Sequence, residues 1–160
     1  LPREEVRMKV RAAVAAAKDS GILVMARTDC RPTAGIEEAV ARIEMYVEEG
    51  ADILFLDSPH DDEEILRAVK AAAGRPSFAV LSPGAPRATP DRKRAIELGF
   101  KIGTYPTGMI SPVAAGIKAG LAALAAGEAE ASCALPPAEL RATLGYGDYD
   151  AAAKKFIVGA

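Results

Sequence analysis

The sequence has no tryptophan, two cysteines and one histidine among its 160 residues. Cys30 and Cys133 lie far apart and match no metal-binding spacing, which argues against a disulfide framework and suits a reducing cytoplasm. The formal net charge of -2 and the few aromatic residues give no reason to expect nucleic acid as a partner. The longest apolar tract, residues 113–126, is mostly alanine and is broken by Lys118. It therefore predicts a helix packed in protein and excludes a membrane span.

Four short apolar runs, each ending in polar residues, are the most regular feature of the chain. They occupy residues 21–29, 52–57, 77–82 and 101–105, and a helical segment follows each of them. The runs are too short for helices and repeat at intervals of about 24 to 30 residues, which is the period of a βα unit. The sequence therefore predicts an α/β fold with its chemistry at the carboxyl ends of parallel strands.

Further helices are indicated at both ends of the chain. A helix is expected over about residues 3–18, and two weaker helical segments over about residues 137–144 and 149–157. Between the second and third strands, Asp61 and Glu64 resemble a capping box, which predicts a helix start.

The number of βα units is small for a closed barrel. A (βα)8 barrel typically needs about 250 residues, and four units are visible, so the chain looks like half a barrel. The alternative is a complete open sheet of the doubly wound kind. A first residue other than methionine and the lack of a strand before the first helix favour the half barrel.

The residues at the strand ends resemble one known family. Met-Ala-Arg-Thr-Asp at residues 25–29 is followed by Glu-Gly-Ala-Asp at residues 49–52, by an acidic strand end at Asp57 and by Tyr-Pro at residues 105–106. This ordered combination, over about residues 3–127, resembles the isocitrate lyase and phosphoenolpyruvate mutase superfamily. The resemblance implies a (βα)8 TIM barrel, usually a homotetramer, that binds Mg2+. Such enzymes cleave or form a C–C or P–C bond beside a 2-oxo carboxylate.

The resemblance also implies how the chain is organised. Residues 1–127 are expected to supply strands five to eight of the barrel, and residues 128–160 a helical tail. The family's magnesium carboxylates and its mobile Lys-Cys-Gly-His-type loop have no counterpart here, so no metal ligand is expected in this chain. The isolated chain is therefore expected to be inactive, while the whole protein is expected to be a cytoplasmic homo-oligomer.

Arg27 and two carboxylates are the first candidate site residues. An arginine at a buried strand end offers two parallel donors to a substrate carboxylate, and its counterpart in the family binds the substrate anion. The alternative is that Arg27 only satisfies Asp29 or Asp57. Asp29 is assigned to substrate binding, as a support for Arg27. Asp57 is assigned to catalysis, at a position where the family usually has glutamate, although it could instead cap a turn.

Three residues of the last two strands complete the predicted site. Val80 lies where the lyase members place an asparagine, and its side chain cannot donate a hydrogen bond. Either Ser82 substitutes from further along the strand, or the protein does not cleave 2-methylisocitrate. Thr104 is expected to line the pocket.

The resulting hypothesis is a Mg2+-dependent lyase that cleaves a C–C bond in a small oxo- or hydroxy-dicarboxylate, such as 2-methylisocitrate or oxaloacetate. The alternatives are a phosphonomutase of the carboxyphosphonoenolpyruvate type and a non-catalytic dicarboxylate-binding barrel.

Overall fold

The structure, a computed structural model, describes residues 1–82, 90–129 and 131–156. The chain divides into two compact units, Leu1–Met109 and Ile110–Ala160. The domain boundary expected near residue 127 stays a prediction. Among the described residues, no helix is both long and apolar enough to cross a membrane.

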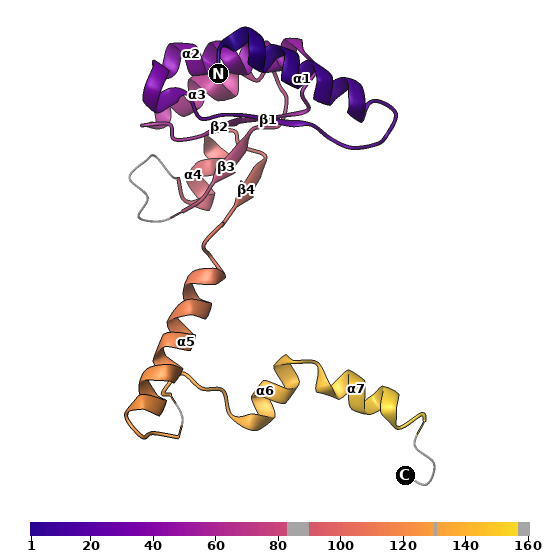
Figure 1. Cartoon of the computed structure of the whole chain (residues 1–160), viewed down its shortest axis with the longest axis vertical. Helices are drawn as coiled ribbons and strands as arrows, with labels where there is room; N and C mark the ends of the chain where they lie inside the picture. Colours follow the sequence, from indigo (N-terminus) through magenta and orange to yellow (C-terminus); the bar gives the residue numbers. More distant parts are fainter. Residues whose placement is uncertain (83–89, 130, 157–160) are drawn as a thin grey trace. The chain divides into compact units, whose positions relative to one another are not determined.

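Helices and strands alternate through the first unit (Figure 1). In the described residues its elements are α1 (Arg3–Ala17), β1 (Met25–Thr28), α2 (Arg31–Glu48), β2 (Ile53–Leu56), α3 (Asp62–Ala71), β3 (Phe78–Val80), α4 (Arg92–Glu97) and β4 (Ile102–Thr104). Each strand lies within one of the four apolar runs, and α1 matches the helix expected over residues 3–18. The chain is therefore α/β, as the sequence predicts.

The strands follow one another in chain order. β1 pairs in parallel with β2, placing Arg27 opposite Phe55, and β3 pairs in parallel with β4, placing Val80 opposite Thr104. A bridge between Leu54 and Ser77 connects the two pairs. The order β1-β2-β3-β4 is that of a (βα)8 barrel, whereas the first four strands of a doubly wound sheet include a reversal.

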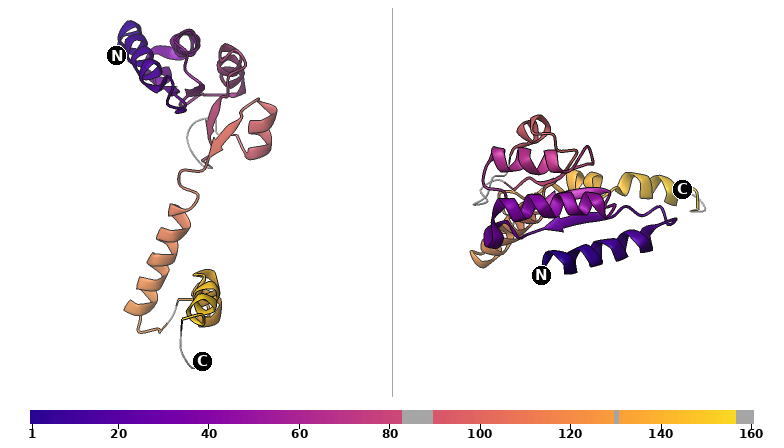
Figure 2. Two further views of the ribbon diagram at one scale, coloured as in Figure 1. Left: turned by 90° about the vertical axis from the view of Figure 1, so that its right-hand side faces the viewer. Right: turned by 90° about the horizontal axis from the view of Figure 1, so that it is seen from above.

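The helices of the first unit cover one side of these strands (Figure 2). Burial alternates along β1, where Ala26 and Thr28 are buried but Met25 and Arg27 are exposed. Successive side chains of a strand point to opposite faces, so the buried pair points towards the helices. The main core cluster consists of Ala26, Ile43, Met45, Tyr46, Ala51, Leu54 and Ala72. The opposite face of the strands is not covered by these helices, and Arg27 of the predicted site points to that face.

Helix α2 is interrupted after its first turn. Gly35 has a φ of 81°, a left-handed conformation that glycine adopts without steric penalty. The apolar positions Ile43 and Tyr46, which are buried in the core, lie in the regular part after this break. Residues 31–34 therefore form a separate turn at the carboxyl end of β1.

The second unit consists, in its described residues, of α5 (Ile110–Ala125), α6 (Pro137–Thr143) and α7 (Tyr146–Ala153). Helix α7 begins three residues earlier than expected, because the left-handed residue is Gly145 and Gly147 lies inside the helix. The helix expected over residues 113–126 is present within α5, and its packing in protein stays a prediction.

Ion pairs attach α1 to α2. Arg7 and Arg11 of α1 both bind Glu49, at 2.8 and 2.7 Å, and Arg3 binds Glu38. No residue of α1 is buried, although Val6 and Val10 pack against the core cluster. Hydrogen bonds from Arg3 and from Arg42 of α2 lower the pKa of Glu38 to about 2, and those from Arg11 and Arg7 lower the pKa of Glu49 to about 2. Docking of α1 therefore depends on two ionised carboxylates.

We expect this docking to weaken in acid. Both folded pKa values lie below the ordinary value of 4.5, so the stabilisation is complete above that pH and is lost as the pH falls from 4.5 towards 2. Glu49→Gln should flatten this pH dependence, measured by urea unfolding followed by circular dichroism. Glu5→Gln is the control, because Glu5 pairs with Lys9 on α1 itself. An equal effect of the two substitutions would contradict the prediction.

Candidate functional site

The predicted site residues lie at or near the carboxyl ends of the strands. Arg27 is opposite Phe55, and the rings of Phe55 and Phe78 lie 4.8 Å apart between their centroids. Asp57 follows Phe55 by two residues, and alternation places both on the same side of β2. By the same rule Asp29 follows Arg27, Ser82 follows Val80, and Thr104 lies opposite Val80. The structure thus places Arg27, Val80 and Thr104 on the face opposite the helices, with Asp29 and Asp57 beside Arg27, while Ser82 lies two residues beyond the end of β3.

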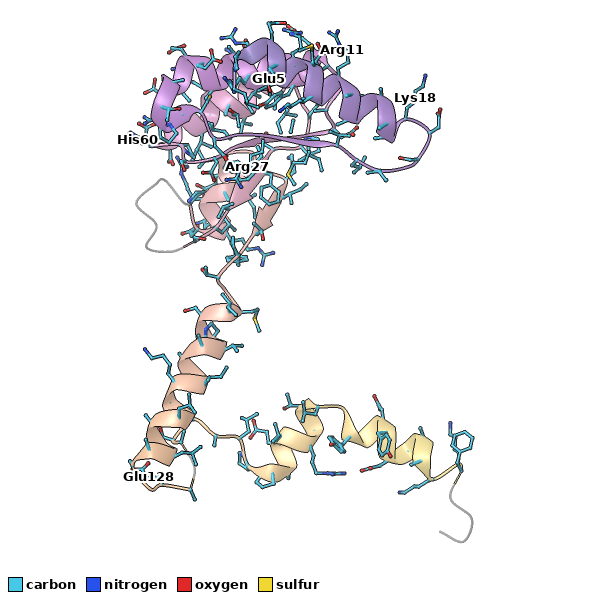
Figure 3. The ribbon with its side chains drawn as sticks, in the orientation of Figure 1. Glu5, Arg11, Lys18, Arg27, His60 and Glu128 are labelled. Carbon is cyan, nitrogen blue, oxygen red and sulfur yellow. The ribbon has the colours of Figure 1, made fainter. Side chains whose placement is uncertain are left out.

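Arg27 is held by both carboxylates. Its Nε donates to Asp29 Oδ1 at 2.5 Å, its Nη2 lies 3.5 Å from Asp57 Oδ1, and its Cζ lies 4.8 Å from the centroid of the Phe55 ring (Figure 3). The hydrogen bond to Asp29 raises the pKa of Arg27 above its ordinary value, so the guanidinium stays charged. The side chain is 51% exposed rather than buried as expected, because it points to the face of β1 that the helices of the first unit do not cover. An anion can therefore reach it.

Asp57 is buried and has a local partner as well. The hydroxyl of Ser58 donates to Asp57 Oδ2 at 2.6 Å, and the backbone N–H of Asp57 donates to the carbonyl of Thr28 at 2.9 Å. Ser58 has a φ of 57°, a left-handed conformation that costs energy for a residue with a Cβ. The same carboxylate therefore takes part in a strained turn and in the pairing with Arg27, so the two roles considered for Asp57 are compatible.

The third and fourth strands carry the remaining candidates. Val80 and Asp57 line the same small cavity of about 20 Å³. Val80, Ser82 and Thr104 are all half-buried, and the N–H of Leu81 donates to the carbonyl of Thr104 at 2.8 Å. Residues 83–89, which follow Ser82, lie outside the described residues.

These side chains do not make a metal site. Across the described ranges, no group of three or more histidine, cysteine, aspartate or glutamate side chains is arranged to hold a metal ion. Asp29 and Asp57 both face the guanidinium of Arg27, and this positive charge opposes a cation beside them. The described donors therefore do not fit Mg2+, and both carboxylates are already paired with Arg27.

A second cluster was not predicted from the sequence. Arg31 forms a forked pair with Glu64, and its Nη1 lies 2.8 Å from His60 Nε2. Asp61 caps α3 as expected, by accepting from the N–H of Glu64. The reciprocal half of the capping box is absent, because the Glu64 carboxylate binds the N–H of His60 and Arg31 instead. No local pattern could have revealed Arg31, since Glu64 is 33 residues away.

Known sequences resemble most of the first unit and part of the second. The sequence profile described as phosphoenolpyruvate phosphomutase matches residues 1–125. The chain is 36% identical over 110 residues to a chloroplastic carboxyvinyl-carboxyphosphonate phosphorylmutase of Arabidopsis thaliana, covering 66% of this chain and 32% of that protein. It is 40% identical over 110 residues to 2,3-dimethylmalate lyase of Eubacterium barkeri, covering 68% and 37%. The chain therefore spans about a third of the length of these relatives.

Solved structures resemble the fold. A crystal structure of 2,3-dimethylmalate lyase, a member of the phosphoenolpyruvate mutase and isocitrate lyase superfamily, matches with a TM-score of 0.82 and 26% identity, over 98% of this chain and 56% of that one. An oxaloacetate acetylhydrolase in complex with oxalate matches with a TM-score of 0.82 and 25% identity, over 97% and 55%. The likeness extends to about half of each of these larger chains.

The left-handed backbone of Ser58 leads to a prediction about stability. Ser58→Gly and Ser58→Ala both remove the hydroxyl group, but only glycine relieves the left-handed strain. The glycine variant should therefore be more stable than the alanine variant by about 1 kcal/mol, measured by urea unfolding. At Ala12, inside α1, replacement by glycine should have the opposite sign and destabilise the protein. Equal stability of the two Ser58 variants would show that this backbone is not strained.

Proposed function

This chain belongs to the phosphoenolpyruvate phosphomutase family, and we propose that it forms part of a lyase-type enzyme acting on small dicarboxylates or 2-oxo acids. The observation that carries the proposal is the position of Arg27, a half-exposed guanidinium held between two carboxylates at the ends of adjacent strands. Relatives named as lyases and mutases support the reaction class.

In this proposal Arg27 binds a substrate carboxylate. Asp29 and the ring of Phe55 orient the guanidinium, which offers parallel N–H donors that match the two oxygens of a carboxylate. Preorganisation of this kind lowers the entropy lost when a ligand binds. Asp29 serves as a support. Asp57 acts as the second polar group of the site: its carboxylate faces Arg27 Nη2 at 3.5 Å and helps to hold the guanidinium at the strand ends.

The rest of the proposed pocket lies on β3 and β4. Val80 contributes an apolar wall, while the hydroxyl groups of Ser82 and Thr104 are the donors available near it. An apolar side chain at residue 80 favours a smaller or less polar substrate than 2-methylisocitrate. Oxaloacetate fits this description, and an oxaloacetate decarboxylase of Paraburkholderia xenovorans is 41% identical to this chain over 88 residues, which are 55% of this chain and 28% of that protein.

We further propose the architecture of the whole enzyme. Residues 1–127 supply strands five to eight of a (βα)8 barrel in a cytoplasmic homo-oligomer, and residues 128–160 form a helical tail. In this architecture Mg2+ is bound by residues outside this chain, since the described donors do not fit it. A phosphonomutase is the second candidate, and its support is the similarity to the Arabidopsis phosphorylmutase.

A chimeric barrel tests the proposed function. The part of Eubacterium barkeri 2,3-dimethylmalate lyase that precedes the matched segment is joined to this chain, and turnover of 2,3-dimethylmalate and of oxaloacetate is measured with and without Mg2+. The chimera should be active. The 160-residue chain alone should be inactive, because a half barrel leaves two strand edges open.

Three outcomes decide between the alternatives. Turnover by the chain alone would contradict the half-barrel proposal. A folded chimera that binds oxalate without turnover would favour the non-catalytic binding barrel. A folded chimera with neither binding nor turnover would overturn the proposed function.

Substitution of Arg27 tests its assignment. Arg27→Lys keeps the charge but loses the fork, so the chimera should bind oxalate more weakly by about 1.5 to 3 kcal/mol, measured by isothermal titration calorimetry. Arg94→Lys is the matched control: Arg94 is similarly exposed, at 47%, and pairs with Asp62 at the start of α3. If Arg27→Lys lowers thermal stability and leaves oxalate affinity unchanged, Arg27 is structural.

A further inference from the structure

Arg31, His60 and Glu64 form a cluster behind the proposed anion site, which we call the Arg31 clamp. Arg31 donates from Nε to Glu64 Oε2 at 2.9 Å and from Nη2 to Oε1 at 2.6 Å. The N–H of His60 donates to Glu64 Oε2 at 2.8 Å. His60 Nε2 lies 2.8 Å from Arg31 Nη1, and since a guanidinium only donates, this ring nitrogen is the acceptor. The clamp joins three chain segments from two successive βα units.

The ion pair of the clamp is largely shielded from water, whereas His60 is exposed. The side chains of Arg31 and Glu64 are 17% and 11% exposed. The hydrogen bond from Arg31 lowers the pKa of Glu64, so both partners are charged. A nearly buried ion pair adds little net stability, because desolvation offsets much of the attraction. Its forked geometry, however, fixes the relative position of the segments that carry it.

The segment that depends most on this geometry is the loop of residues 57–60. At its upstream end the N–H of Asp57 is bonded to the carbonyl of Thr28, and at its downstream end the N–H of His60 is bonded to Glu64. Ser58, between these two anchors, has the left-handed φ of 57°. A strained backbone persists only when its surroundings hold it in place. Loss of the downstream anchor would let the loop relax and would move Asp57.

The position of Arg31 in the chain allows it to fix the loop of residues 57–60 relative to β1. It lies on the separate turn before Gly35, two residues after Asp29. The clamp therefore joins the segment after Arg27 on β1 to the segment after Asp57 on β2. His60, labelled in Figure 3, follows the end of β2 by four residues.

We propose that Arg31 is a positioning residue: acting through Glu64 and His60, it holds the loop of residues 57–60 so that the Asp57 carboxylate stays against Arg27. The expected effect of Arg31 on ligand binding rests on the proposed function. The claim that Arg31 holds the loop of residues 57–60 in place does not depend on that function and can be tested on this chain alone.

Amide hydrogen exchange of the 160-residue chain, followed by NMR, tests the mechanical part. Arg31→Gln should lower the protection of the His60 and Asp57 amides about tenfold, while the amide of Leu54, bonded to the carbonyl of Pro76, keeps its protection. The matched control is Arg67→Gln, which removes the pair of Arg67 with Glu37 between the same two helices at their exposed surface. This control should leave all three amides unchanged.

A second variant covers the case in which Arg31→Gln does not fold. Glu64→Asp keeps the charge but shortens the side chain by one methylene, so it cannot reach both Arg31 and the N–H of His60. It should produce the same local loss of protection. If the Leu54 amide lost as much protection as the His60 and Asp57 amides in these variants, the clamp would stabilise the whole unit and not the loop in particular. If the protection of the His60 and Asp57 amides were unchanged, the clamp would not hold the loop. Either result overturns the proposal.

Oxalate binding by the chimeric barrel tests the consequence. Arg31→Gln should weaken oxalate binding about tenfold, although Arg31 does not touch the proposed site, and Arg67→Gln should not change it. If the unsubstituted chimera binds no oxalate, the proposed function fails, and the exchange experiment still decides whether the clamp positions the loop. If the chimera binds oxalate equally well with and without Arg31, the positioning role is overturned.

Discussion

One-sided burial of a parallel sheet is the constraint on which this structure depends. The helices of the first unit cover one face of the strands, so alternate residues, such as Ala26 and Leu54, are committed to the core. The intervening residues, such as Arg27 and Phe55, must then point to the opposite face. Because parallel strands all end at the same edge, the polar residues that terminate them are brought together there. The candidate site is a direct consequence of this arrangement.

The charged groups of the chain act in two different ways. Between α1 and α2, arginines meet Glu38 and Glu49 near the surface, where they attach a helix that buries no residue of its own. At the strand ends, Arg27 meets Asp29 and Asp57 in a polar cluster that remains half exposed. The first set completes the fold. The second leaves donor capacity that an anion can use, which is why family membership and local geometry lead to the same proposal.

Asp57 has two partners at the strand ends. The hydroxyl of Ser58 donates to one carboxylate oxygen, while the other faces Arg27. The left-handed backbone at Ser58 requires support from its surroundings. The Arg31 clamp lies where that support is needed. A residue without any contact to a ligand can therefore matter to the site as much as one that touches it.

The sequence by itself determined the α/β class, the four strand positions, α1 and the family, because apolar periodicity and strand-end residues are local signals. It also identified Arg27, Asp29, Asp57, Val80, Ser82 and Thr104 as candidates; the structure pairs Arg27 with Asp29 and Asp57 and Val80 with Thr104, while their roles remain proposals. Only the tertiary structure decided that Arg27 is half exposed, that Gly147 lies inside a helix and that Glu64 binds Arg31 rather than completing a capping box. These features depend on which elements are adjacent in space. The partner of Arg31 lies 33 residues away, and a sequence pattern does not show what lies opposite a side chain at that distance.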